Sequence, residues 1–172
     1  MMDPTQKADN TEALEKANEV FQKLLTTQQS AMLATVNPDG SPLVSYAPFV
    51  IDTDKNIYVF TSALYHHTTN LLRAGLVSVM LIADKTATAQ IFARSRLTFA
   101  CTVEALPRDT DTWQTAARLY EKRFANMFKL LRGLSDFSMF KLTPHSGTLV
   151  VGFGAAYSLH GDNLSELTLR VG

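Results

Sequence analysis

The sequence predicts a mainly β chain with three helices (α+β), in which antiparallel hairpins form a small barrel. Three observations support this prediction: runs rich in Val, Ile, Tyr and Phe, turn signals such as Pro38-Asp39-Gly40 between them, and three segments with apolar residues at helical spacing. The 172 residues suffice for one domain with a full core. We expect residues 1–9 to form a mobile arm and residues 10–172 a single domain.

The first half of the chain is predicted to contain two helices and four strands. In order, these are a helix at about 10–28, strands at 31–36, 42–51 and 57–61, a helix at 67–74 and a strand at 76–83. Asp9 and Glu12 resemble a capping box for the first helix, and Gly75 is a usual C-cap residue for the second. Apolar residues on both faces of 42–51 predict burial of both, one of them by the core and the other by a candidate second subunit.

The second half is predicted to contain a long strand, a long helix and two closing strands. We expect the strand at 90–105, the helix at 110–132 after Pro107, and closing strands at 137–142 and 148–159, separated by 143–147. In the long strand alternate residues such as Leu97, Phe99 and Cys101 are apolar, so one face is core and the other polar. The helix has an apolar stripe from Trp113 to Leu131, which is typical of packing against a core.

Composition narrows the class of protein. Sixteen Lys plus Arg balance sixteen Asp plus Glu, so the chain lacks the basic excess that nucleic-acid or membrane-surface partners require. No apolar run is long enough to span a bilayer, and the polar start lacks the apolar region of a signal peptide. The single Cys101 excludes an internal disulfide. We therefore expect a cytoplasmic protein with a small-molecule ligand and neither nucleic-acid nor membrane partners.

The segment from Ile57 to Leu72 is the first candidate site. A strand there enters a polar loop and then a short helix, whose first N–H groups can bind an anion. Its candidate ligand-binding residues are Thr61, Ser62, His66, His67 and Thr68. Each histidine can donate to a phosphate or simply cap the helix. Adjacent side chains diverge and no Cys or carboxylate lies at ligand spacing, so no metal site is predicted.

Arg94 and Arg96 are the second candidate, since one strand face would hold two guanidinium groups. Such a pair needs an anionic ligand, or ion pairs with Glu104 or a neighbouring subunit. Gly152-Phe153-Gly154 lacks the third glycine of a dinucleotide loop, and Cys101 lies on the apolar face. No nucleophile elbow, Walker loop or paired-carboxylate motif is present, so no catalytic residue is assigned.

The order of several short motifs resembles the pyridoxamine 5'-phosphate oxidase-like, FMN-binding split-barrel proteins, and within them the haem-utilisation subgroup. The motifs, which span about Gln29 to Leu164, are Leu33–Val36, Val44–Val50, His67 with Asn70-Leu71, Phe92–Phe99, Ser135–Phe137 and Gly152–Gly154. The resemblance implies a six-stranded antiparallel split β-barrel, a homodimer, and ligand pockets at the subunit interface.

Two departures from the family pattern bear on the cofactor. Flavin-phosphate members carry arginine and lysine on the second barrel strand, where this chain has residues such as Ser45 and Val50. They also carry a Ser-Arg-Lys run at the positions that Tyr65, His66 and His67 occupy here. Similar haem-degrading proteins place an axial histidine in a C-terminal tail, whereas the last histidine here is His160. Asp136 does match an acidic residue that the subgroup uses near its haem.

The resemblance implies first an FMN-dependent oxidoreductase, a flavoprotein with its cofactor between two subunits. The phosphate is expected near Ser62 and His67, with Arg94 or Arg96 assisting, and the flavin ring near Tyr46. Two alternatives stay open. One is a haem-binding protein of iron utilisation, whose arginines pair the propionates and in which His66, His67 or His145 reaches iron. The other is a non-catalytic dimeric domain.

Overall fold

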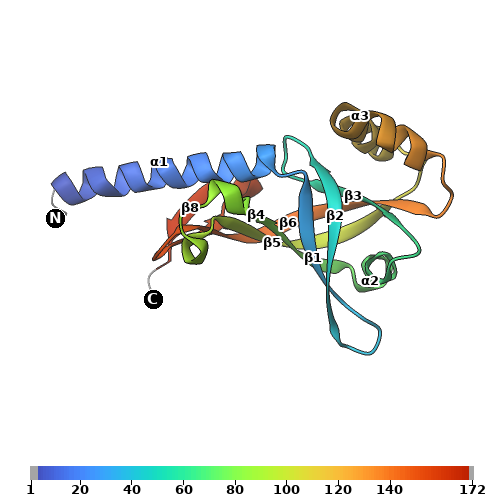
Figure 1. The fold of residues 1–172 in the computed structure, drawn as a ribbon, viewed down its shortest axis with the longest axis horizontal. Helices are drawn as coiled ribbons and strands as arrows, with labels where there is room; N and C mark the ends of the chain where they lie inside the picture. Colours follow the sequence, from blue (N-terminus) through green and yellow to red (C-terminus); the bar gives the residue numbers. More distant parts are fainter. Residues whose placement is uncertain (1–3, 171–172) are drawn as a thin grey trace.

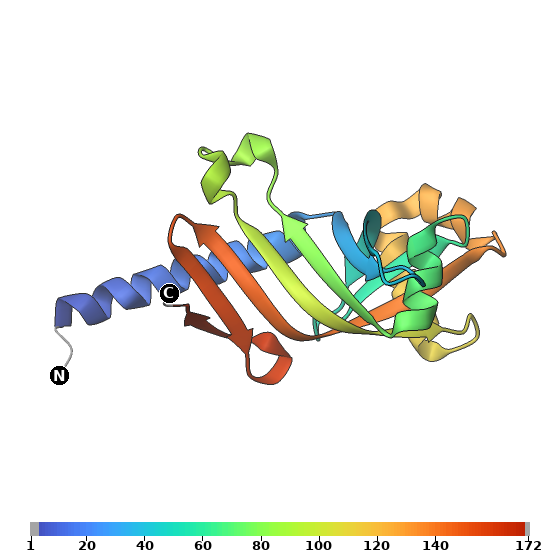
Figure 2. The same ribbon diagram turned by 90° about the horizontal axis from the view of Figure 1, so that it is seen from below.

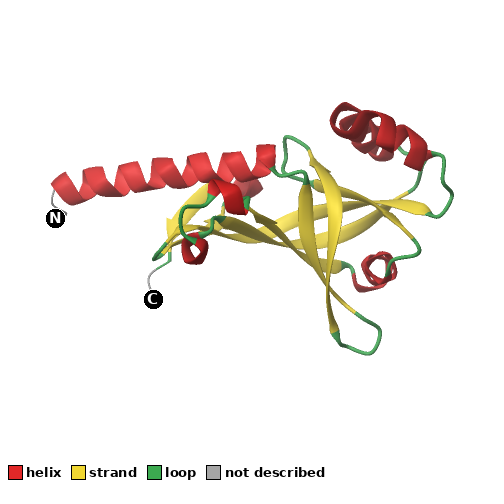
Figure 3. Ribbon diagram, viewed as in Figure 1, coloured by secondary structure: helices red, strands yellow, loops and turns green. Residues whose placement is uncertain are grey.

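The computed structural model describes residues 4–170 as eight strands and three α-helices (Figure 3). The helices are α1 (Pro4–Thr27), α2 (His66–Ala74) and α3 (Asp111–Arg132). The strands are β1 (Ser30–Val36), β2 (Pro42–Ile51), β3 (Ile57–Ser62), β4 (Leu76–Ile82), β5 (Arg96–Leu106), β6 (Phe137–Gly152), β7 (Ala155–His160) and β8 (Glu166–Leu169). No helix within residues 4–170 is both long and apolar enough to cross a membrane.

Six antiparallel strands close into a barrel. The strand order is β3-β2-β1-β4-β5-β6, and pairing of β3 with β6 closes the ring. β7 and β8 continue the sheet beyond β6 and lie beside α1, away from the barrel end that carries α2 (Figures 1 and 2). The predicted α+β fold and the six-stranded antiparallel split barrel are therefore confirmed.

Strand alternation places one set of side chains inside the barrel. In β5 the predicted apolar residues Leu97, Phe99 and Cys101 are buried, and their inward neighbours on β4 and β6 include Val79 and Leu149. The C-terminal half of α1 closes this core with its own apolar residues, which are Ala17, Phe21, Leu24 and Leu25. The inward face therefore needs no further partner, and any ligand must use the outer faces or the barrel ends.

α3 covers the place where the barrel is split. β2 and β3 pair only from Phe49 to Ile51, because Pro48 has no N–H with which to continue the ladder toward Phe60. The buried Tyr120 hydroxyl fills this gap: it accepts a hydrogen bond from the Phe60 N–H at 3.0 Å and lies 3.0 Å from the Pro48 carbonyl oxygen. Burial raises the pKa of Tyr120 far above its usual value, so the hydroxyl stays protonated and can donate to that carbonyl.

We expect Tyr120→Phe to lower the free energy of unfolding by about 1–3 kcal/mol, because it leaves the buried Phe60 N–H without an acceptor. Urea unfolding followed by circular dichroism measures this change. Tyr65→Phe is the matched control, since its exposed ring loses a hydroxyl that contacts solvent. Equal loss of stability in both variants would show that Tyr120 does not bridge the split.

Three expectations on strand boundaries are wrong. Residues 90–95 form a loop with a 3-10 turn at Ile91–Ala93 instead of strand, and this loop is closed by the Ala83 N–H donating to the Ser95 carbonyl. Residues 143–147 continue β6 across a bulge opposite β5 rather than interrupt it. The single strand expected at 148–159 is broken by the β6–β7 turn, where Gly154 has φ 67°. Helix α1 begins at Pro4, earlier than expected.

Candidate functional site

The end of β3 brings Thr61 and Ser62 against the first turn of α2, but their hydroxyl groups face inward. Both residues are buried, as is Thr68. The Thr68 hydroxyl lies 2.6 Å from the Ser62 carbonyl oxygen and 3.0 Å from the Thr61 hydroxyl. The Ser62 hydroxyl donates to a carboxylate oxygen of Asp136 at 2.6 Å. These three predicted ligand donors thus hold the β3–α2 loop instead of facing a ligand.

Asp136, at the start of β6, fixes the entry into α2 from the other side. Its main-chain oxygen accepts from the Ala63 N–H at 2.8 Å, while Ser62, bound to its carboxylate, in turn accepts from the Leu64 N–H at 3.1 Å. Asp136 itself is exposed, and within residues 4–170 only one of its carboxylate oxygens has a hydrogen-bond donor. The other oxygen is therefore free to accept from a ligand or a second chain.

His67 is the one residue of this region with an unsatisfied buried atom. The side chain is 5% exposed, and its Nε2 has no hydrogen-bond partner in the described part of the chain. The ring stacks on Tyr65 with centroids 5.3 Å apart. Burial holds the pKa of His67 below its usual value, so the ring is neutral. Because Nε2 is buried, it is not accessible to an external ion in the single chain.

The neutral His67 predicts a defined pH dependence of stability. In the unfolded chain the histidine has a pKa of about 6.5, whereas burial lowers its pKa in the folded chain. Below about pH 6.5 the unfolded state therefore binds more protons than the folded state, so the free energy of unfolding falls as the pH drops. We expect this loss to approach about 1.4 kcal/mol per pH unit, and to disappear in His67→Leu. Urea unfolding between pH 5 and pH 8 measures it, with the exposed His66→Leu as control. A His67→Leu profile parallel to the wild type would contradict the prediction.

The N-terminal end of α2 has no side-chain cap. Tyr65 occupies the N-cap position without a side-chain hydrogen bond, and His66 is exposed. An uncapped helix start carries free N–H groups and partial positive charge. Of the predicted loop residues, His66 therefore stands in a position to meet a ligand.

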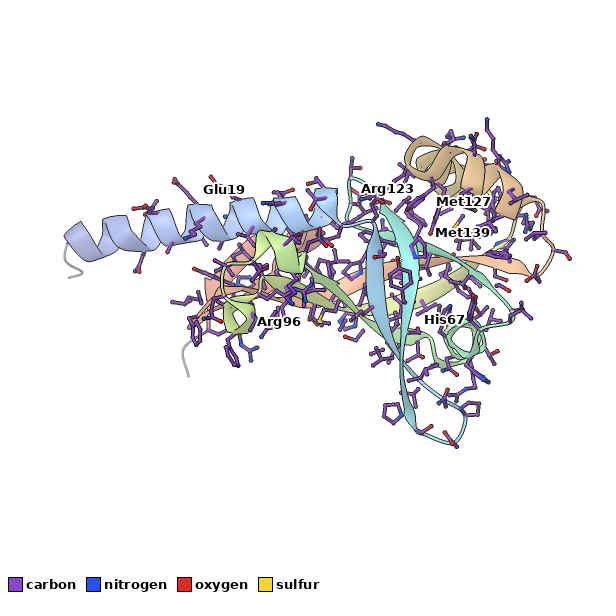
Figure 4. The ribbon with its side chains drawn as sticks, viewed as in Figure 1. Glu19, His67, Arg96, Arg123, Met127 and Met139 are labelled. Atoms are coloured by element: carbon purple, nitrogen blue, oxygen red, sulfur yellow. The ribbon has the colours of Figure 1, made fainter. Side chains whose placement is uncertain are left out.

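Arg94 and Arg96 do not lie near α2 in the same chain. α2 leads directly into β4, whose Leu76 pairs with Thr102 of β5, whereas Arg96 pairs with Ile82 at the opposite end. Six residues of strand separate Arg96 from Thr102, or about 20 Å. In Figure 4 the labelled Arg96 and His67 lie in different parts of the molecule, with His67 on α2 and Arg96 away from it. Neither arginine therefore lies at the α2 start of its own chain, so the prediction that one of them assists an anion there requires a second copy.

The two arginines also do not share a strand face. Arg94 lies in the loop before β5, where its Nε donates to the Ala83 carbonyl at 2.6 Å. Arg96 begins β5, and its guanidinium donates to the Arg94 carbonyl at 3.1 Å. Both side chains are half-buried and keep further N–H groups free for an anion.

Arg96 lies at the border of an outer barrel face that residues 4–170 leave uncovered. Tyr46, Met32, Met80 and Thr98 stand side by side across β2, β1, β4 and β5, and Arg96 is two residues from Thr98 on the same face. Tyr46 is 64% exposed and Met32 42%. The next row contains the small residues Ala34, Ser78 and Ala100 beside Val44. We call these rows the outer face; a flat partner can approach it closely.

Sequence reasoning identified Tyr46 but missed Met32, Met80 and the small residues of the outer face. The signal was present, because 31–36 and 76–82 alternate in the same way as 42–51. Exposure alone reveals that no helix covers these rows, since α3 packs on Val50, Tyr58 and Phe60 instead. A contiguous exposed apolar surface of this kind marks a binding site.

Comparison with known proteins agrees with this architecture. Residues 17–151 match the model of the pyridoxamine 5'-phosphate oxidase family. The heme oxygenase HutZ of Vibrio cholerae is 39% identical over 139 residues, which are 81% of this chain and 78% of that protein. A solved structure of HutZ, there described as the heme storage protein of Vibrio cholerae, has TM-score 0.73 and 34% identity, covering 79% of this chain and 94% of that one.

More distant structures share the fold. Campylobacter jejuni ChuZ has TM-score 0.79 at 24% identity and covers 97% of this chain and 71% of that one. A heme binding protein from Mycobacterium smegmatis has TM-score 0.73 at 23% identity, over 88% of this chain and 59% of that one. With the barrel described above and a family match over most of its length, the chain belongs to the pyridoxamine 5'-phosphate oxidase family, in its haem-utilisation subgroup.

Proposed function

We propose that this protein binds haem between the outer faces of two copies. The observation that carries the proposal is the exposed apolar outer face with Arg96 at its border. Haem is a flat, largely apolar ring with two carboxylates. The apolar rows can therefore pack against the ring, and a guanidinium can bind a carboxylate through charge-assisted hydrogen bonds. The names given to HutZ, a heme oxygenase and a heme storage protein, support haem over other flat anions.

A homodimer explains why the candidate residues lie so far apart in one chain. A two-fold axis that crosses the strands reverses their direction, so the Arg96 end of one copy faces the α2 end of the other. His66, the free oxygen of Asp136 and Arg96 then belong to one composite site. The apolar outer face itself is the surface that we expect the dimer to bury.

Among the histidines considered as iron ligands, His66 fits best. The Nε2 atom of His67 is buried, and His145 lines a separate polar cavity with Asp54 and Asn163. His66 is exposed and follows the loop that Asp136 holds. Bound haem would supply iron for oxygen chemistry, while the chain's own residues would orient the ring and hold its carboxylates.

FMN is the second candidate cofactor, favoured by the family and by the uncapped start of α2. A flavin would make the protein an oxidoreductase. The inward-facing hydroxyls of Thr61, Ser62 and Thr68 leave few donors there for a dianionic phosphate, which weighs toward haem. Because its single cysteine is a free, buried thiol, we also propose a cytoplasmic location.

Titration with haem tests the proposal. We expect a Soret band that saturates at a fixed haem-to-chain ratio, and no flavin absorption band in the purified protein or after addition of FMN. His67→Ala is expected to leave the Soret position unchanged, because its Nε2 is buried, whereas His66→Ala shifts it. Saturable FMN binding without haem binding would replace the proposal by the flavoprotein alternative, and uptake of neither would leave the non-catalytic dimer.

A further inference from the structure

A second concave site lies on the other side of the barrel, where α1, the β2–β3 turn and α3 meet. Its cavity has a volume of about 610 Å³. Its apolar lining comes from Leu25 of α1, Val50 and Ile51 of β2, and Leu119 of α3, and polar side chains of α1, the β2–β3 turn and α3 complete the walls. Val50 belongs to the core under α3 and not to the outer face. The cavity is thus separate from the proposed haem site and belongs to one chain.

Positive charge exceeds negative charge in the lining of this cavity. Arg123 and Lys122 of α3 both line it, and no hydrogen bond or ion pair joins Lys122 to another residue of the described 4–170. Asp52 is the single acidic residue in the lining, and its two oxygens already accept four hydrogen bonds. The donors are the N–H groups of Asp54 and Asn56, the Asn56 amide and the Tyr58 hydroxyl.

Contacts within the chain hold the Arg123 guanidinium in place but leave some of its N–H groups free. One guanidinium nitrogen donates to the Thr26 and Gln28 carbonyls at the end of α1, and the group lies over the Phe49 ring at 5.4 Å. Burial lowers the pKa of Arg123 from its usual value, because desolvation disfavours the charged guanidinium. A negatively charged group in the cavity would relieve this cost.

We propose that this cavity binds a small amphipathic anion, with its charged group against Lys122 and Arg123 and its apolar body on Leu25, Ile51 and Leu119. Apolar walls with a few fixed polar groups are typical of small-molecule sites. The neighbouring Lys55, whose ammonium donates to the Asn163 carbonyl at 2.6 Å, also lines the cavity and adds to its positive charge. Two cations against an apolar wall select an acid with a hydrocarbon or aromatic body over a neutral molecule or a free phosphate.

The probe for this site is 8-anilinonaphthalene-1-sulfonate, which carries a sulfonate on an aromatic body and fluoresces when it leaves water. With the full chain we expect saturable binding at one site per chain. Lys122→Glu is expected to raise its Kd about tenfold or more, because a charge-assisted contact becomes a repulsion. Lys129→Glu, on the same helix but outside the cavity, is the matched control and should change Kd by less than about twofold.

Two further measurements locate the probe. Amide chemical shifts should move at Gln22, Thr53 and Leu119, which line the cavity, and the uncharged N-phenyl-1-naphthylamine should bind at least about tenfold more weakly. Shifts confined to the outer face, or equal Kd values in the two lysine variants, would overturn the proposal. Haem titration of Lys122→Glu should match the wild type, so failure of one site is distinguishable from failure of the other.

Discussion

Met32→Asp is expected to convert a dimer, of twice 19.0 kDa, into a monomer. Met32 stands in the middle of the outer face, between Tyr46 and Met80, and is 42% exposed in the single chain. A carboxylate there is tolerated in a monomer but would be buried without a partner in the dimer. Burial of the unpaired carboxylate costs several kcal/mol of dimerisation free energy, which raises the dimer dissociation constant by about a thousandfold. Light scattering after size-exclusion chromatography measures the mass.

The control for Met32→Asp is Leu130→Asp, an apolar and more exposed position on α3. Its mass should equal that of the wild type. Haem titration of the monomeric Met32→Asp protein should show weakened, non-saturating uptake, because each copy supplies one half of the site. A monomeric wild type, or a Met32→Asp dimer that still binds haem, would remove the basis of the interface proposal.

Much of the fold could be predicted because its signals are local. Alternation of Leu97, Phe99 and Cys101 identified the inward face of β5, and the apolar stripe that starts at Trp113 identified α3. The loop at residues 90–95 could not be recognised, since Ile91 and Phe92 continue the apolar pattern although both are exposed. What ends the strand there is a set of contacts with Ala83, a neighbour in space that periodicity does not show.

The candidate site was harder to predict because hydroxyl direction depends on tertiary contacts. Thr61, Ser62 and Thr68 were correctly placed beside one another, yet the sequence does not reveal that Asp136 binds Ser62 across β3 and β6. The distance between Arg96 and α2 follows from the β4–β5 register, which no residue pattern specifies. The outer face was visible only in part, since exposure of Met32 depends on which strands the helices leave uncovered.

Arg96 gives the sharpest functional test of the composite site. Its guanidinium borders the outer face and has one hydrogen bond, to the Arg94 carbonyl, so the remaining N–H groups can hold a haem carboxylate. Reversal of this charge removes an attraction and adds a repulsion, each worth about 1.5 kcal/mol or more. We therefore expect Arg96→Glu to raise the Kd for haem about a hundredfold while the chain still folds, because Arg96 is only half-buried.

Arg118→Glu on the exposed side of α3 is the charge-matched control, and haem affinity should stay within about twofold of the wild type. Arg96→Lys keeps the charge but loses the paired N–H geometry, so an intermediate Kd is expected. Salt should weaken haem binding in the wild type and strengthen it in Arg96→Glu, because it screens an attraction in the first and a repulsion in the second. If Arg96→Glu and Arg118→Glu bind haem equally well, the ligand does not place its carboxylates at this border, and the composite site across two chains fails with it.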